Sequence, residues 1–372
     1  MIDTMGIIIA SDINIPPLTD FRSASALPIA GGYRIIDFVL SGMANAGIKN
    51  VGVATKANYS SLMDHIKSGS PWDLKRKKRG LNILPPNIGN KNYFEAIRGD
   101  LDILYGIKEY IRRSSETYVV LSLGNSIYNI DFKEVVKTHI KNQSDVTIIY
   151  KNMEHVDQKE LSRYTLLEVD ENKCVTDIEV RPYYPKSTNA SMDLFVMEKA
   201  LLESIIDECY AKGNHNFIKD AIAKKMDGLR VFGFEHKGYT DKIDSMKSYF
   251  DNNMEFLCHD VREEMFHSSL PVYTKNRDLP PSKYGENSEV RNSYIADGCV
   301  IDGTVINSII SGQVHIKKGA VVKNCVIMQG CTIGENVCIE YVVLDKEVEI
   351  TDGKQLIGQE NYPLPVSKGT VI

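Results

Sequence analysis

The stretch LTDFRSASALPIAGGYRIIDF, residues 18–38, decides how the N-terminal part of the chain is expected to fold. It follows a short apolar segment, GIIIAS (6–11), whose composition predicts a buried strand. It holds the turn-forming pair Gly31 and Gly32 and then becomes apolar at helical spacing, beginning near Ile36. A strand, a loop and a helix in this order are where nucleotide-binding α/β proteins hold phosphate. The stretch therefore predicts an α/β domain with a ligand site beside its first strand.

The alternation of strand and helix continues to about residue 257. It favours parallel βαβ units, with a β-rich excursion at 163–200, and so predicts a mixed, mostly parallel sheet of the Rossmann-like type. The clearest helices are predicted at 60–69, 100–112, 215–226 and 245–257. Ligands of such sheets bind at the carboxyl ends of strands. That rule places five residues in one cleft region: Ser11, Asp12, Gly124, Asn125 and Ser126.

The pattern changes after a Pro- and charge-rich segment, KNRDLPPSKYG (275–285), which we interpret as a linker. Aliphatic residues then recur at a six-residue step, which is typical of a left-handed parallel β-helix. A β-sandwich would instead show a period of two with longer turns. We interpret the irregular steps as insertions at the corners of the β-helix. The aliphatic residues are Ile295, Ile301, Ile310, Ile316, Val322, Ile327, Ile333 and Ile339. The expected domains are 1–260 (nucleotidyltransferase-like α/β), 261–288 (linker) and 289–372 (left-handed β-helix).

Composition excludes several classes of function. The 372 residues carry a formal net charge of −5, which gives no general attraction to nucleic acid or to a membrane surface. No signal peptide and no membrane-spanning apolar run is apparent, so a cytoplasmic protein is expected. The seven cysteines lack metal-ligand spacing, and four of them (Cys299, Cys325, Cys331 and Cys338) are expected to be reduced thiols in the β-helix, largely buried.

A basic run, LKRKKRG (74–80), has two main interpretations. It is either a solvated loop or an anion site in which Lys75, Arg76 and Arg79 bind a phosphorylated ligand or effector. Nucleic-acid binding is a weaker third interpretation, because no aromatic residues are interleaved with the charges.

The stretch 18–38 also carries a specific resemblance. With the sequence that follows it to Thr55, it resembles the N-terminal region of bacterial glucose-1-phosphate adenylyltransferases (ADP-glucose pyrophosphorylases). Further matches occur at RGDLD (98–102), ASM (190–192) and YTKNRDLPPSK (273–283), so the resemblance covers nearly the whole chain. Active members of that family join ATP and glucose 1-phosphate, with Mg²⁺ held by carboxylates and with a glycine-rich loop around the phosphates.

The chain departs from the family at the residues that carry this chemistry. The family's Gly-Gly-x-Gly-x-Arg loop is here SDINIPPLT (11–19), without glycine, so the backbone cannot approach a triphosphate closely. Ala24 replaces the phosphate-binding lysine. Asn125 and Lys242 replace the two aspartates that bind Mg²⁺, and Val180 replaces the glutamate of the sugar-phosphate site.

The resemblance therefore implies a non-catalytic, regulatory subunit of glucose-1-phosphate adenylyltransferase in glycogen synthesis. Such subunits assemble with a catalytic paralogue into a heterotetramer and raise its activity. We expect no catalytic residue and no metal site in this chain, with Mg²⁺ and ATP bound by the partner. Retained residues could still bind a sugar phosphate or a phosphorylated effector: Arg22, Arg34, Asp102, Ser191 and Tyr239.

Two alternatives remain open. The first is an active adenylyltransferase with a rearranged metal site. The second is an interaction protein or an acyltransferase that uses the β-helix, for which His315 is the only candidate catalytic histidine in that domain.

Overall fold

The computed structural model describes residues 3–10, 13–56, 58–85 and 97–372. The chain forms two compact units, each assembled from segments that are separate in sequence. The first unit comprises residues 1–11, 39–59 and 67–240, and the second comprises 12–38, 60–66 and 241–372. The domain boundaries given above stay a prediction, because contacts define units in space and not domains along the chain.

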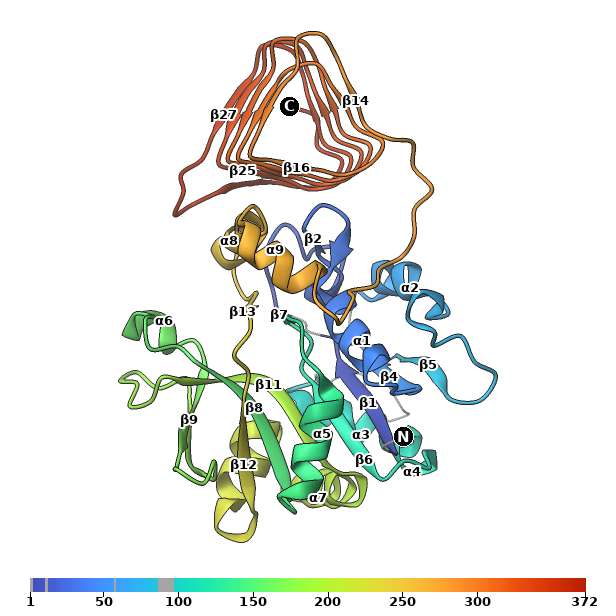
Figure 1. Ribbon diagram of the computed structural model, residues 1–372, viewed down its shortest axis with the longest axis vertical. Helices are drawn as coiled ribbons and strands as arrows, with labels where there is room; N and C mark the ends of the chain where they lie inside the picture. Colours follow the sequence, from blue (N-terminus) through green and yellow to red (C-terminus); the bar gives the residue numbers. More distant parts are fainter. Residues whose placement is uncertain (1–2, 11–12, 57, 86–96) are drawn as a thin grey trace. The chain divides into compact units, whose positions relative to one another are not determined.

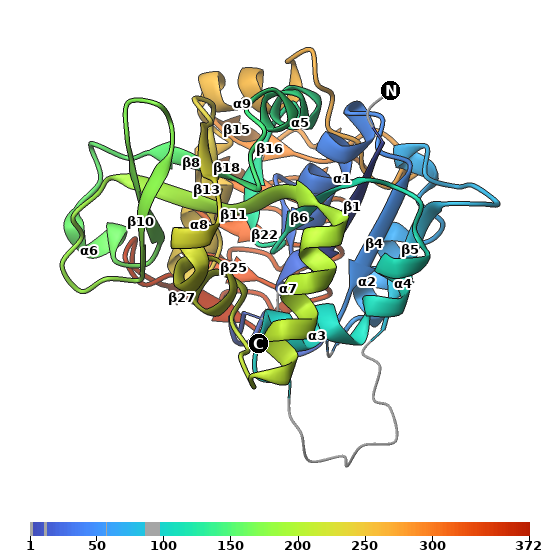
Figure 2. The same cartoon turned by 90° about the horizontal axis from the view of Figure 1, so that it is seen from below.

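The first unit is built on a mixed sheet that has nine strands in the described part of the chain (Figures 1 and 2). The strands are β1 (Thr4–Ile9), β4 (Asn50–Ala54), β5 (Gly80–Leu84), β6 (Tyr118–Ser122), β8 (Val146–Asn152), β9 (Thr165–Val169), β10 (Val175–Val180), β11 (Asn189–Glu198) and β12 (Val231–Glu235). Their main path runs β10-β9-β11-β6-β1-β4-β5, and β8 pairs with β11 and β12. β6, β1, β4 and β5 are parallel, whereas β11 runs antiparallel to β6 and β8. Every residue of β1 is buried, as expected of a central strand covered on both faces.

Short helices connect these strands. They include α3 (Asp100–Gly106), α4 (Lys108–Arg113), α5 (Phe132–Lys141), α6 (Gln158–Leu161) and α7 (Lys199–Ala211), while α1 (Ile35–Asn45) belongs partly to each unit. The predicted helix at 100–112 is wrong as one helix, because Ile107 adopts φ −102° and ψ 8° between α3 and α4. The predicted helix at 215–226 is a π-helical turn, η3 (Phe217–Ile222), followed by a 3-10 segment, η4 (Ala223–Gly228). The Asn216 side chain accepts a hydrogen bond from the Lys219 N–H and caps the wider turn.

The second unit contains the left-handed β-helix, whose three faces are three parallel sheets of five short strands in the described residues (Figure 1). The first face is β14 (Lys283–Tyr284), β17 (Val300–Ile301), β20 (His315–Ile316), β23 (Thr332–Ile333) and β26 (Glu349–Ile350). The second is β15 (Glu289–Arg291), β18 (Thr304–Ile306), β21 (Val321–Lys323), β24 (Cys338–Glu340) and β27 (Gln355–Ile357). The third is β16 (Tyr294–Ile295), β19 (Ile309–Ile310), β22 (Val326–Ile327), β25 (Val342–Leu344) and β28 (Leu364–Val366).

The six-residue step is confirmed: it carries the chain from one face to the next, as from Ile310 on β19 to Ile316 on β20, and the aliphatic residues of successive coils stack inside the β-helix. Ile301, Ile316 and Ile333 pair in register on one face, and Ile310, Ile327 and Leu344 do so on another. The interpretation of the irregular steps as insertions is wrong for the first coils. Val305 fills the apparent gap between Ile301 and Ile310, and those steps are shorter than six residues.

Asparagine recurs at one set of equivalent corners of the β-helix. Asn292, Asn307 and Asn324 occupy equivalent corners and have φ between 40° and 48°, a region that asparagine tolerates better than most residues. The Asn292 amide donates to the Asn307 side-chain oxygen at 2.9 Å. Inside the coil, Cys299, Cys325 and Cys331 are buried free thiols, and burial raises the pKa of the Cys325 thiol to about 12. Cys338 is only partly buried.

The rest of the second unit is formed by residues 12–38, α2 (Ser60–Ile66), α8 (Met246–Glu255) and α9 (His259–Phe266). Residues 12–38 include one 3-10 turn, η1 (Ala24–Ala26), and a two-stranded ribbon of β2 (Pro28–Ile29) and β3 (Tyr33–Arg34). Aromatic rings join these parts: Tyr33 stacks on Phe266 with ring centroids 4.7 Å apart. No helix of the described residues is long and apolar enough to cross a membrane.

The interior stack predicts a clear difference between two isoleucines of the β-helix. Ile327 is fully buried, whereas Ile357 on β27 is 64% exposed. We expect Ile327→Ala to lower the free energy of unfolding by about 2–5 kcal/mol, because it removes buried methyl groups and leaves a cavity. The matched control Ile357→Ala should change it by no more than about 0.5 kcal/mol. Urea denaturation followed by circular dichroism measures both, and equal losses would contradict the interior position of Ile327.

Candidate functional site

Most of residues 13–38, which follow the first strand, are buried. The predicted site residues Ser11 and Asp12 lie outside the described residues. Beyond them, the Thr19 hydroxyl accepts a hydrogen bond from the Ile15 N–H at 2.8 Å and closes the local turn. Ala24, at the position of the family's phosphate-binding lysine, is completely buried within η1. This position therefore contributes a methyl group to packing where the family offers a cation.

The glycine pair of this segment has a packing role. Gly31 has φ 72°, and a Cβ atom there would lie 2.9 Å from the ring of Tyr294 on β16. Only glycine combines this backbone conformation with such a close approach. A Cβ atom on Gly32 would meet nothing within 4 Å. Gly31 therefore lets the turn pack closely against the β-helix.

The two arginines of the segment are buried and held by protein groups. Arg22 donates through Nη1 to Asp345 Oδ1 at 2.7 Å, and the side chains are 3% and 0% exposed. Arg34 donates to the carbonyl and hydroxyl oxygens of Ser61, at 2.6 and 3.0 Å. Burial lowers the pKa of the Arg34 guanidinium to about 10, although Asp37 opposes the shift. Both arginines therefore contribute to the interior of the second unit.

Asp37, in the first turn of α1, joins several segments of the second unit through its carboxylate. Its carboxylate accepts hydrogen bonds from the Arg34 N–H at 2.9 Å and from Thr274 Oγ1 at 2.6 Å, and it pairs with His65 Nε2 at 2.6 Å. Burial lowers the pKa of His65, although the contact with Asp37 opposes the shift. These contacts account for Asp37 without any ligand.

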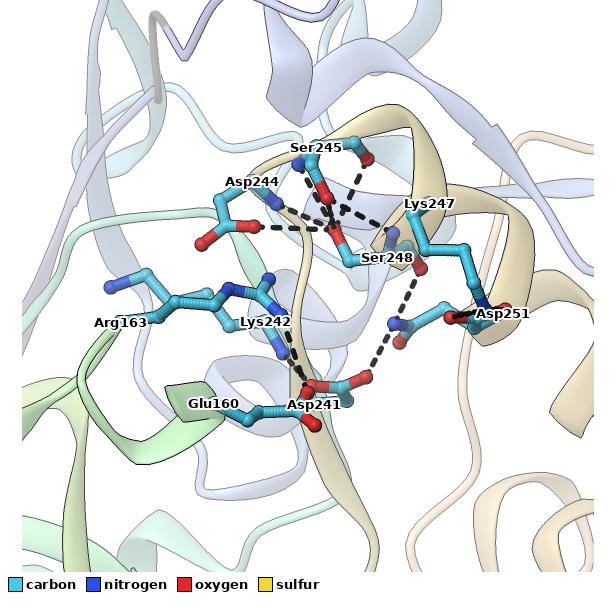
Figure 3. A network of polar contacts seen from close by, with 10 residues as sticks. Glu160, Arg163, Asp241, Lys242, Asp244, Ser245, Lys247, Ser248 and Asp251 are labelled. Carbon is cyan, nitrogen blue, oxygen red and sulfur yellow. Dashed lines mark hydrogen bonds and ion pairs between the residues drawn. The ribbon is translucent and has the colours of Figure 1, made fainter. Parts of the chain in front are cut away.

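Lys242, which replaces one metal-binding aspartate, is 8% exposed in β13 (Thr240–Lys242). Lys242 and the carboxylates that flank it in sequence belong to one network of polar contacts that reaches α8 (Figure 3). Asp241 accepts a hydrogen bond from the Asn252 amide at 2.6 Å, and Asp244 accepts one from the Ser248 hydroxyl at 3.3 Å. Ser245 and Ser248 form a capping box that satisfies the first N–H groups of the helix. The segment is therefore built as a helix start.

Asn125, which replaces the other metal-binding aspartate, lies just after β6 in the first unit and is 4% exposed. The N–H of neighbouring Leu123 donates to the carbonyl oxygen of Asp193 on β11. Asp193 and the predicted binding residue Ser191 therefore lie near this strand end. Asp193 occupies a register break of β11 with φ 55°, and its N–H donates to Ser191 Oγ at 3.2 Å. The bulge places a buried carboxylate beside Ser191.

A second carboxylate of this region, Asp100, was missed by sequence reasoning. It accepts a hydrogen bond from the Phe217 N–H at 2.7 Å, and burial, with a smaller contribution from Asp193, raises the pKa of its carboxyl group to about 6. The predicted binding residue Asp102 accepts from the N–H groups of Arg98 and Gly99 and pairs with His215 Nδ1 at 2.9 Å. Asp102 thus fixes the start of α3, a role that the RGDLD pattern alone does not show.

The remaining predicted residues lie elsewhere. In the basic run, Lys75 is exposed, Arg76 pairs with Asp73, and Arg79 contacts Ser115 Oγ at 2.8 Å and Glu116 at 3.3 Å. The run leads directly into β5, an end strand of the sheet. Tyr239 is partly buried between β12 and β13, and the candidate acyltransferase residue His315 is exposed on β20.

Two further cations accompany the arginines of the second unit, and sequence reasoning did not select them. Arg277 donates to Gln329 Oε1 at 2.7 Å, and Lys346 follows Asp345 in the chain. Burial, together with Arg34, Arg22 and Arg277, lowers the pKa of the Lys346 ammonium group to about 7. We call Arg22, Arg34, Arg277 and Lys346 the cationic cluster. Its members come from distant parts of the chain, so no local pattern shows it.

The family's Mg²⁺ does not fit the residues at its two positions. The Asn125 amide brings no charge and the Lys242 ammonium group opposes a cation. In the part of the chain that the structure describes, no three His, Cys, Asp or Glu side chains form a group that could hold a metal ion.

Known proteins match both parts of the chain. The nucleotidyl transferase family matches residues 14–258, and the GlmU-like C-terminal hexapeptide family matches residues 280–362. The glycogen biosynthesis protein GlgD of Bacillus subtilis (strain 168) is 35% identical over 96% of this chain and 93% of its own length. Two glucose-1-phosphate adenylyltransferases, from Clostridium perfringens (strain SM101) and Bacillus mycoides (strain KBAB4), are 32% and 31% identical. They cover 85% and 92% of this chain, and 81% and 91% of their own lengths.

These matches confirm the resemblance drawn from residues 18–38, and the fold has both predicted parts. The chain belongs to the glucose-1-phosphate adenylyltransferase family of nucleotidyl transferases.

Proposed function

We propose that this chain is a regulatory, catalytically impaired subunit of glucose-1-phosphate adenylyltransferase that acts in ADP-glucose and glycogen synthesis by assembling with a catalytic paralogue. The observation that carries the proposal is the buried Lys242 at a position where the family needs a metal-binding carboxylate. A buried ammonium group repels Mg²⁺ far more strongly than an exposed one would, because water screens it less.

The other changes point in the same direction. Asn125 removes the second metal carboxylate, and Ala24 removes a cation that would face phosphate. Adenylyl transfer depends on positioning and on stabilising the charge of the phosphates, so the loss of both kinds of group is expected to cost orders of magnitude in rate. The name of the Bacillus subtilis relative refers to glycogen biosynthesis and not to an adenylyltransferase activity, which agrees with the proposal.

The proposed partner is a catalytic chain of the same family, in a hetero-oligomer that the resemblance implies to be a heterotetramer. We also propose that the chain retains binding without catalysis. Arg22 and Arg34 would contact a phosphorylated effector, and Ser191 a sugar phosphate. For Ser191 the nearby carboxylate of Asp193 is unfavourable, because it would repel a phosphate group.

The chain is expected to differ in activity with and without its partner. The purified chain, given ATP, glucose 1-phosphate and Mg²⁺, should form no ADP-glucose above background. Added to a catalytic adenylyltransferase chain of the same organism, it should raise the rate and elute with that chain in size-exclusion chromatography. Pyrophosphate release measures the rate. Substantial activity of the isolated chain would instead support an active enzyme with a rearranged site.

Restoring the two metal-binding carboxylates should not restore catalysis. Asn125→Asp and Lys242→Asp together restore the carboxylates but leave Ala24 and the glycine-free segment 13–19 unchanged. We expect the double variant to remain at least about a hundredfold below a catalytic family member, because phosphate-stabilising groups are still missing. The same pyrophosphate assay decides this. Full activity from the two changes would show that the N-terminal segment does not limit catalysis.

The buried carboxylate of Asp193 is expected to weaken the binding of glucose 1-phosphate. Asp193→Gly suits the φ of 55° and removes a buried carboxylate beside Ser191. We expect glucose 1-phosphate to bind the isolated chain about tenfold more tightly, which corresponds to about 1.4 kcal/mol. Isothermal titration calorimetry measures the affinity.

The control for this prediction separates charge from size. Asp193→Asn keeps the side-chain volume and tolerates the same backbone conformation. It should bind as tightly as Asp193→Gly if charge is the cause. An unchanged affinity in both variants would exclude Ser191 and Asp193 from a sugar-phosphate site.

A further inference from the structure

The loop that leads into β5 is anchored at both ends and exposed between them. Leu74 is buried, and its carbonyl oxygen accepts a hydrogen bond from the Leu81 N–H at 3.1 Å. Near the other end of the loop, Arg79 lies 3.3 Å from the buried carboxylate of Glu116. The side chains of residues 75–79 are nevertheless all exposed, and the loop protrudes from the sheet in both views (Figures 1 and 2). The loop therefore holds a run of cations in solvent.

Three of these cations have no counter-ion in the part of the chain that the structure describes. Arg76 pairs with Asp73, and Arg79 pairs with Glu116. The cations that form no ion pair with a described residue make up what we call the lysine tip: Lys75, Lys77 and Lys78. In a chain with a formal net charge of −5, such a concentration of positive charge attracts an acidic surface.

The opposite end of the same sheet has the complementary charge. β9 and β10 end the main path of the sheet on the side away from β5, as Figures 1 and 2 show. Glu168 on β9 is directly opposite Asp177 on β10, and like charges in this position destabilise a strand pair. Glu171 is exposed in the turn between the two strands. These three carboxylates form no ion pair with a described residue, and we call them the acidic edge.

We propose that the lysine tip of one chain docks on the acidic edge of a second copy of this chain, in a head-to-tail contact. The two surfaces have opposite charge, and each carries three unpaired groups. They lie at opposite ends of one sheet, so a single chain cannot join them, whereas two chains can. The contact brings cations to the Glu168–Asp177 pair and relieves a repulsion that the isolated chain retains. This inference goes beyond the proposed function and does not depend on it.

Other polyanions fit the lysine tip less well. Single-stranded nucleic acid binds where aromatic side chains accompany the cations, and residues 73–80 contain no aromatic residue. A membrane surface binds a basic segment firmly where apolar side chains insert beside the charges, and the apolar side chain of this loop, Leu74, is buried. The acidic edge is the polyanionic surface that the chain itself supplies.

Charge reversal at each surface tests the contact in the purified full chain. The tip variant carries Lys75→Glu, Lys77→Glu and Lys78→Glu, and the edge variant carries Glu168→Lys, Glu171→Lys and Asp177→Lys. In either variant both ends of the sheet have one sign of charge. At about 0.1 M salt, where the Debye length is about 10 Å, each variant alone should self-associate at least about tenfold more weakly than the unmodified chain. Self-association of the unmodified chain should weaken similarly at about 1 M salt. Sedimentation velocity over a range of protein concentrations measures all of these associations.

Mixing the two variants is the decisive measurement. The negative tip of one variant then meets the positive edge of the other, so the contact is restored with its charges exchanged. The mixture should recover most of the association that each variant lost alone, because specificity follows the complementarity of charge.

A matched control separates the contact from net charge. Lys283→Glu, Lys318→Glu and Lys354→Glu change three exposed lysines of the β-helix and shift the net charge as much as the tip variant does, from −5 to −5 − 6 = −11. This control should self-associate like the unmodified chain. Circular dichroism confirms that each variant folds, and the tip variant and its control decide the outcome if the edge variant does not.

Several outcomes would overturn the proposal. One is an unmodified chain without salt-dependent self-association, and another is an equal loss of association in the β-helix control. A mixture that fails to recover would exclude the pairing of these two surfaces. A tip variant that self-associates normally but no longer elutes with a catalytic chain would assign the tip to the hetero-oligomer. No adenylyltransferase assay enters the test, so failure of the proposed function would leave its outcome unchanged.

Discussion

The buried ion pair between Arg22 and Asp345 is the constraint on which the second unit depends. It joins residues that are 323 positions apart, and both side chains are almost completely inaccessible to solvent. A buried pair loses much of its attraction to desolvation, but removing one partner leaves an uncompensated charge and typically destabilises a protein by about 3–5 kcal/mol. The pair therefore fixes where residues 13–38 lie on the β-helix. The close contact of Gly31 with Tyr294 acts in the same direction.

This constraint explains why a segment with the outline of a phosphate loop has a different role here. A phosphate-binding loop needs backbone N–H groups and cations that remain available to the ligand. In this chain Arg22 and Arg34 are engaged with protein groups, and Ala24 is a packing residue. At the other positions the residues disfavour Mg²⁺ or phosphate: carboxylates are absent where Mg²⁺ would need them, and the buried carboxylate of Asp193 would repel a phosphate group. Substitutions without a common cause would not be expected to disfavour both ligands.

The sequence predicts best what is local. The β-helix follows from the six-residue step because each step carries the chain to the next face, where the aliphatic residue stacks on its equivalent in the next coil, as Ile316 does on Ile333. The helices at 100–112 and 215–226 were predicted less well, since periodicity cannot show a break at Ile107 or a π-helical turn after Asn216. At the site, the resemblance selected Arg22 and Arg34. Their partners Asp345 and Ser61, and the neighbouring Arg277 and Lys346, come from segments that only the folded chain brings together.

The same long-range partners determine what regulation is physically possible. A ligand can shift a conformational equilibrium only by the difference in its affinity for the two states. If Arg22 were simply open, any phosphate would bind it in every state and would shift nothing. Arg22 is instead paired with the buried carboxylate of Asp345, so a ligand would reach it only in a state where that ion pair is broken.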